Sequence, residues 1–110
     1  YEKRNSSLIS CGAAIAKYTG ARGKSSTNDA SAELLGYVRK LFRDNGVIFQ
    51  VSEMGKVDAG GGGTVAKYIS LHNIDTIDIG VPVISMHAPF EVVSKADIYS
   101  TFEALSVFVK

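Results

Sequence analysis

Cysteine, proline and long apolar runs are scarce in this 110-residue chain. Its single cysteine, Cys11, excludes an intrachain disulfide and a four-cysteine zinc site. One unpaired thiol also favours a reducing compartment, so we expect a cytoplasmic location. The longest apolar run, residues 79–86, contains Gly80 and Pro82 and is far shorter than the roughly 20 residues that a membrane helix needs. We therefore expect no membrane partner.

An excess of charge of either sign is also lacking. Twelve Lys and Arg residues stand against eleven Asp and Glu residues, which gives a formal net charge of +1. Nucleic-acid-binding domains carry a strongly basic patch, so this balance predicts no nucleic-acid partner. With 45% hydrophobic and 21% charged residues, the composition is that of one globular domain or a part of one. The absence of an initiator methionine at Tyr1 predicts that the chain is a piece of a longer protein.

Hydrophobic periodicity predicts strands that alternate with helices. Apolar extended segments are expected at 8–18, 47–51 and 76–86, and helices at 29–44, 64–71 and from 95 onwards. Residues 19–28 have the composition of turns and loops. This order predicts an α/β fold in which helices cover a mainly parallel sheet.

The first and last predicted helices carry recognisable end signals and apolar faces. Asn45-Gly46 supplies a left-handed stop after the first helix. Ser94-Lys95-Ala96-Asp97 resembles a capping box at the start of the last helix, with Asp in place of Glu or Gln. The apolar faces are Ala30, Leu34, Leu35, Val38, Leu41 and Phe42 in the first helix and Ile98, Phe102, Leu105 and Val109 in the last. Further apolar residues near the end of the last helix predict either packing against other segments or a subunit interface.

The glycine run 60–63, followed by Thr64 and a predicted helix, is the strongest compositional feature. Consecutive glycines lose much conformational entropy on folding, so a close approach of the backbone to a ligand is one interpretation. The N–H groups of the helix start would then face an anion or a developing oxyanion. A flexible connection is the alternative. The run is not a P-loop, because GxxxxGK[ST] is absent.

Three other residues are candidates for chemistry. His87 follows the last predicted strand, where open parallel sheets build their sites, and its imidazole either binds a metal or has a structural role. Lys17 ends an apolar segment and either presents its ammonium to a substrate or extends to solvent. Cys11 is expected to be a buried filler. No HExxH motif or Cys/His cluster accompanies His87, so a complete metal site cannot be assembled from this chain.

Three stretches together resemble the aspartyl aminopeptidase family, which includes the vacuolar aminopeptidase of yeast and many bacterial homologues. They are Gly55-Lys56-Val57-Asp58-Ala59 with the glycine run and Thr64-Val65-Ala66-Lys67; residues 79–91, which contain Ser85-Met86-His87-Ala88-Pro89; and Lys17-Tyr18-Thr19-Gly20 with Gly23-Lys24-Ser25 and Asn28-Asp29-Ala30. The resemblance covers roughly residues 11–110. It implies that residues 1–110 are the C-terminal portion of a single metallopeptidase catalytic domain with a zinc-peptidase-like fold.

This resemblance implies a metallo-aminopeptidase that removes acidic or neutral N-terminal residues from peptides. The family uses two divalent metal ions, usually zinc and sometimes cobalt or manganese, and its members commonly form homo-oligomers. His87 would be the terminal metal ligand, Lys17 would contact the substrate, and Gly62, Gly63 and Thr64 would lie beside it. The metals would polarise the scissile carbonyl and activate water, and a glutamate from upstream would act as general base.

The family's bridging Asp, its other ligands and its glutamate all precede the start of this chain. The isolated chain is therefore expected to be inactive, with the remainder of the catalytic domain as its partner. Two other function classes stay open. One is a phosphate-binding module built on Gly60 to Thr64, and the other is a non-catalytic assembly or scaffold domain.

Overall fold

A computed structural model describes residues 5–21, 25–53 and 63–110, with six strands and three helices in these ranges. The strands are β1 (Ala13–Ala21), β2 (Ser25–Asp29), β3 (Phe49–Glu53), β4 (Asp78–Gly80), β5 (Val83–Ile84) and β6 (Val92–Val93). The helices are α1 (Ala32–Asp44), α2 (Ala66–Ser70) and α3 (Lys95–Phe108). Within the described ranges, none of these helices is both long and apolar enough to cross a membrane.

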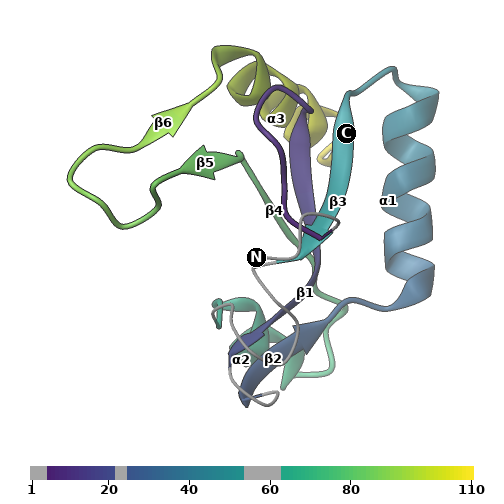
Figure 1. Cartoon of the computed structure of the whole chain (residues 1–110). Helices are drawn as coiled ribbons and strands as arrows, with labels where there is room; N and C mark the ends of the chain where they lie inside the picture. The colour runs from purple at the N-terminus through teal and green to yellow at the C-terminus, as the bar shows by residue number, and fades with distance from the viewer. Residues whose placement is uncertain (1–4, 22–24, 54–62) are drawn as a thin grey trace.

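Strand β1 is the centre of the larger sheet (Figure 1). It pairs in parallel with β3 along one edge, from Ala13 to Tyr18. The other edge is shared by two antiparallel neighbours, with β4 opposite residues 14–16 and β2 opposite residues 18–21. The α/β class is therefore confirmed, but the described sheet is mixed rather than mainly parallel.

The hairpin of β1 and β2 is one reason why the sheet is mixed and not mainly parallel. Residues 19–28 have turn-like composition, yet they form the end of β1 and most of β2. Only residues 22–24 separate the two strands, and their own placement lies outside the described part of the chain. A connection this short joins antiparallel neighbours, because a parallel crossover needs a dozen or more residues.

Helix α1 forms as its sequence predicts, although it begins at Ala32 rather than at residue 29. Ser31 is the N-cap, and its Oγ accepts a hydrogen bond from the backbone N–H of Leu34 at 3.1 Å. Gly46, with φ of +69°, reverses the chain after the last turn. Val38 and Phe42 are fully buried, so the predicted apolar stripe faces the core.

The core lies on one face of the sheet, between β1 and the two long helices. Ala13 and Ile15 point to this face because alternate residues of a strand share a side. The buried cluster is Ala13, Ile15, Val38, Phe42, Val47 and Ala104. The Phe42 and Phe49 rings meet edge to face with centroids 5.6 Å apart, which joins α1 to β3.

Helix α3 begins where predicted, but the capping-box hydrogen bonds do not form. Ser94 is the N-cap without a side-chain cap bond. The Asp97 carboxylate is buried instead, and it accepts the backbone N–H groups of Ser10 at 2.8 Å and Gly12 at 2.9 Å. Positive φ angles at Ser10 and Gly12 turn these two amides toward one carboxylate, so Asp97 anchors the start of β1 to α3.

The predicted apolar face of α3 exists but is exposed. The helix turns Asp97, Ser100 and Ala104 inward, while Phe102 is 65% exposed and Ile98, Leu105 and Val109 face solvent as well. Cys11 is also exposed, contrary to the prediction of a buried filler. It lies in the turn of residues 10–12 that precedes β1, where the side chains are not packed into the core.

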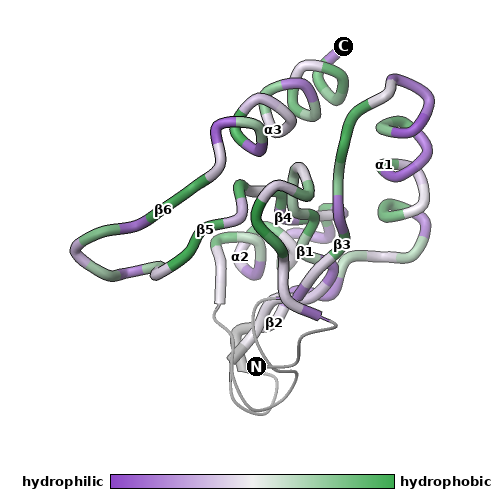
Figure 2. The backbone as a smooth tube through the Cα atoms, turned by 45° about the horizontal axis from the view of Figure 1, so that its top comes forward, coloured by the Kyte–Doolittle hydropathy of each residue, from purple (hydrophilic) through white to green (hydrophobic). Residues whose placement is uncertain are grey.

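The predicted strand region 76–86 divides at Val81–Pro82 into β4, in the main sheet, and β5. Strands β5 and β6 pair antiparallel through Val83↔Val93 and Ile84↔Val92. This hairpin, which we call the arm (residues 83–93), projects away from the sheet in both views (Figures 1 and 2). Its side chains include exposed Met86, Phe90 and Val92, so the arm presents apolar surface to solvent.

Candidate functional site

Lys17 lies in β1 and forms an ion pair with Asp29, the last residue of β2. The side chain of Lys17 is 31% exposed and that of Asp29 is 64% exposed. The Ala30 N–H donates to the Lys17 carbonyl oxygen at 2.9 Å, which joins the end of β2 to β1 beside the ion pair. The Lys17 ammonium is therefore paired with a carboxylate, and it neither extends freely into solvent nor offers an uncompensated charge.

The end of the glycine run is tied to the main sheet. Gly62 lies outside the described residues, Gly63 is exposed, and Thr64 is half-buried. Thr64 Oγ1 donates to Asp78 Oδ2 at 3.1 Å and lies 3.5 Å from Thr19 Oγ1. Because Asp78 is in β4 and Thr19 in β1, two strands position the residue that follows the glycines.

These contacts bring two of the predicted site regions together. Lys17 and Thr19 are two residues apart on β1, and Asn28 of β2 donates from Nδ2 to the Thr76 carbonyl oxygen at 3.0 Å, toward the start of β4. We call this group the polar cluster: Lys17, Thr19, Asn28, Asp29, Thr64 and Asp78. Sequence reasoning missed Asp29 and Asp78 as partners, since each meets its candidate residue only through the fold.

His87 lies elsewhere, in the turn that joins β5 to β6 at the outer end of the arm. Its φ is +69°, and its backbone N–H donates to Glu91 Oε1 at 2.5 Å. The Ala88 N–H donates to the Ser85 carbonyl oxygen at 3.0 Å and completes the turn. The imidazole is exposed and forms no hydrogen bond with any described residue. The arm points away from β2 and α2 in Figures 1 and 2, so the structure does not bring His87 to the polar cluster.

A metal centre is incomplete on this chain. A catalytic zinc ion takes about three protein ligands, and no group of three or more His, Cys, Asp or Glu side chains with suitable spacing occurs among residues 5–21, 25–53 and 63–110. His87 has the chemistry of one ligand, but the described residues do not supply a second or a third beside it. A complete centre therefore does not fit this part of the chain alone.

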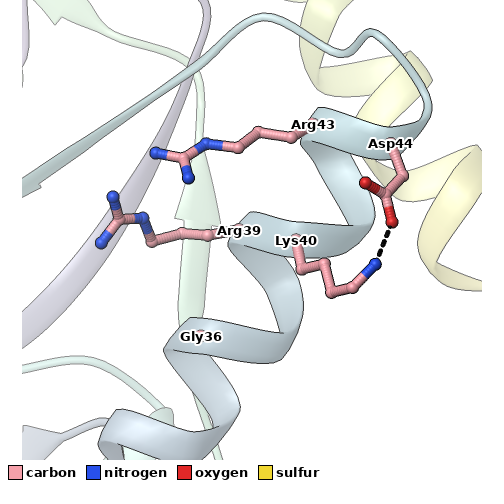
Figure 3. A pocket seen from close by; sticks show the side chains of 5 residues that line it. All are labelled: Gly36, Arg39, Lys40, Arg43 and Asp44. Carbon is pink, nitrogen blue, oxygen red and sulfur yellow. Dashed lines mark hydrogen bonds and ion pairs between the residues drawn. The ribbon is translucent and has the colours of Figure 1, made fainter.

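An open groove of about 400 Å³ lies on α1 and has no part in the predicted site (Figure 3). Its lining residues are Gly36, Arg39, Lys40, Arg43 and Asp44. Lys40 and Asp44 form an ion pair one helical turn apart. The groove is a solvated, charged helix face.

The helix that follows the glycine run is short. It spans Ala66–Ser70, and its N-cap, Val65, makes no side-chain cap bond. A single helical turn and a half supplies a weak dipole, so the phosphate-binding alternative gains no support from the described residues.

Comparison with known proteins decides the family. Residues 1–109 match the family model of the aminopeptidase I zinc metalloproteases (M18). The chain belongs to this family. A probable M18 family aminopeptidase 1 from Thermotoga maritima is 50% identical over 104 residues, which cover 94% of this chain and 23% of that protein.

Solved structures agree with the family. The crystal structure of an M18 aminopeptidase from Thermotoga maritima superposes with a TM-score of 0.93 at 47% identity, over 100% of this chain and 24% of that one. A more distant structure, PhTET1-12s, described as a dodecamer, has a TM-score of 0.74 at 19% identity and covers 94% of this chain and 28% of its own. This second likeness shows the fold alone.

The chain spans about a quarter of the length of the M18 relatives that it matches. The resemblance found in the sequence is thereby confirmed, and so is its assignment to the α/β peptidase fold. The roles of Lys17, Gly62, Gly63, Thr64 and His87 stay predictions, since the structure describes their surroundings and not a substrate or a metal.

Proposed function

We propose that residues 1–110 are the C-terminal portion of the catalytic domain of a metal-dependent aminopeptidase, which removes acidic or neutral N-terminal residues from peptides. The match to the M18 zinc metalloprotease family over residues 1–109 carries this proposal. The share of its relatives' length that the chain spans, about a quarter, supports a partial domain that is inactive by itself.

His87 is the metal ligand that this chain contributes. Its imidazole is exposed and unbonded among the described residues, whereas its backbone is held by Glu91 and by the turn of residues 85–88. An imidazole binds a metal through one ring nitrogen, and the partner that would orient its other ring nitrogen would come from the remainder of the catalytic domain. The other ligands of the two divalent ions, zinc or in its place cobalt or manganese, and the glutamate base belong to the remainder of the catalytic domain.

Lys17, Gly62, Gly63 and Thr64 border the peptide substrate. The contact between Thr64 and Thr19 supports this, because it holds the end of the glycine run beside the strand that carries Lys17. Residues without side chains let a peptide backbone approach closely. These residues bind and orient the substrate, and none of them is proposed to transfer a proton.

The remainder of the catalytic domain and further copies of the enzyme are the protein partners. The exposed apolar residues of α3 and the arm support both, since monomeric proteins seldom leave such surface uncovered. The single cysteine supports a cytoplasmic location, and the net charge of +1 supports the absence of a nucleic-acid partner.

The test uses the intact enzyme with two histidine variants. His87→Ala should lower the bound zinc per chain and reduce kcat/KM for dipeptides about 100-fold or more, as loss of a ligand does. His72→Ala is the matched control, because His72 is also exposed and follows α2 instead of lying in the arm. Zinc per chain is measured by elemental analysis. Activity is measured as kcat/KM with dipeptides that begin with Glu, Gln or Leu.

Wild-type zinc content and turnover in His87→Ala would remove His87 from the metal centre. An intact wild-type enzyme that holds no metal and cleaves none of the three peptides would overturn the peptidase proposal and favour the scaffold alternative.

A further inference from the structure

The Lys17–Asp29 ion pair places a second, opposite charge at a proposed substrate contact. Lys17 is on β1 and Asp29 closes β2, so the hairpin itself holds the carboxylate beside the ammonium. The backbone bond from Ala30 N–H to the Lys17 carbonyl oxygen, at 2.9 Å, fixes the register at this point. The register of the hairpin therefore keeps Lys17 and Asp29 adjacent across β1 and β2.

The other charged residues in the described parts of the four strands of this sheet are acidic. Glu53 of β3 is in register with Tyr18, on the opposite edge from Asp29. Asp78 of β4 is in register with Ala16. The described residues of these four strands thus include one lysine and three carboxylates, of which Asp29 is the one that contacts Lys17.

A substrate carboxylate would gain little at such a position. An unpaired ammonium attracts a carboxylate, but the Asp29 carboxylate beside Lys17 repels the same group and offsets part of that attraction. An acidic side chain would also give up its hydration to reach Lys17, and the compensated ammonium returns little for that loss. An uncharged side chain meets neither cost.

We propose that Asp29 is a specificity-determining residue whose carboxylate neutralises Lys17, so that the site takes uncharged N-terminal residues in preference to acidic ones. The inference rests on the proposed function, in which Lys17 borders the substrate. It narrows that function, because acidic and neutral residues are no longer equivalent substrates.

The measurement is the ratio of kcat/KM for two peptides that differ only in an N-terminal Glu or Gln. These residues have the same shape, so the ratio reports charge alone. The intact, metal-loaded wild-type enzyme should prefer the Gln peptide. Asp29→Asn should raise the Glu/Gln ratio about fivefold, which is the upper range for a partly exposed ion pair.

Two further variants test whether the effect acts through Lys17. Lys17→Met leaves Asp29 uncompensated and should lower the Glu/Gln ratio below the wild-type value. In the double variant, Asp29→Asn should no longer raise the ratio, because no ammonium is left to be freed. Should Asp29→Asn fail to fold, Asp29→Ser is measured in its place, and an unchanged Glu/Gln ratio in that variant would overturn the proposal.

The matched control is Asp44→Asn, which breaks the Lys40–Asp44 pair on α1. This pair has the same chemistry but lies outside the polar cluster, so its loss should leave the Glu/Gln ratio unchanged. An equal rise in Asp44→Asn would overturn the proposal, since the effect would then be one of overall charge.

A wild-type enzyme that favours Glu, or an unchanged ratio in both Asp29→Asn and Lys17→Met, would overturn the specificity role while the peptidase function stands. An enzyme that cleaves neither peptide would overturn both, and that result is distinct from the first.

Discussion

The two long helices, α1 and α3, are nearly equal in length but bury opposite kinds of residue. Helix α1 turns Val38 and Phe42 into the core and leaves its charged residues in solvent. Helix α3 turns Asp97, Ser100 and Ala104 toward β1 and leaves Phe102 and Leu105 exposed. The apolar face of α1 is therefore buried within this chain, whereas α3 has a large apolar face that no described residue covers.

The difference follows from how closely each helix approaches the sheet. Small side chains on the inner face of α3 let it lie against β1, where Asp97 also binds the amides of Ser10 and Gly12. A face of large residues would keep the helix further away. The small face thus packs within the chain, and the large face is suited to contact with the rest of the catalytic domain or with another subunit.

Phe42→Ala should have the largest effect on stability, because it removes the main core contact of α1. Phe42 is fully buried and contacts Phe49, so the substitution opens a cavity and should cost about 3–5 kcal/mol of unfolding free energy. Phe42→Leu keeps more of the volume and should cost distinctly less. Urea unfolding of the intact enzyme, followed by circular dichroism, checks both. Equal, small effects of the two variants would mean that α1 is not packed as described.

Phe102→Ser tests whether the outer face of α3 is covered in the intact enzyme. Phe102 and Tyr37 of α1 are similarly exposed here, at 65% and 58%. If the remainder of the domain covers α3 only, Phe102→Ser should cost about 2 kcal/mol, whereas Tyr37→Ser should stay within about 0.5 kcal/mol. The measurement is thermal unfolding with sedimentation of the same samples. A sedimentation change at unchanged stability would assign the face to a subunit contact, and no change in either would leave α3 exposed in the assembled enzyme.

Local sequence signals predicted the parts of the fold that depend on neighbours along the chain. The stripe of α1 and the turn at Gly46 both follow from residue type and period. Periodicity also identified the residues that share a face of α3. It could not tell which face packs, because that depends on Asp97 meeting two amides more than 80 residues away in the chain.

For the candidate site too, some residues were predicted from the sequence, and their partners in the fold were not. The roles predicted for Lys17, Gly62, Gly63, Thr64 and His87 came from a family resemblance. The carboxylates that contact Lys17 and Thr64 were not predicted. Asp29 and Asp78 lie 12 and 14 residues from their partners, across a hairpin and a helix, where no local rule applies. No pattern here predicts a complete metal centre, since the described residues hold no group of three or more His, Cys, Asp or Glu side chains that could bind one ion.

The smallest expected effect on stability concerns the N-cap residues of α1 and α3. Ser31 and Ser94 occupy the same N-cap position, but only Ser31 accepts a backbone hydrogen bond through its side chain. Ser31→Ala should therefore cost about 1 kcal/mol of unfolding free energy, and Ser94→Ala only a few tenths. Urea midpoints of the two variants, measured in parallel, give the difference. Equal losses would mean that Ser94 caps α3 after all, so that the capping box predicted from the sequence would form in solution and Asp97 would be shared between the helix start and β1.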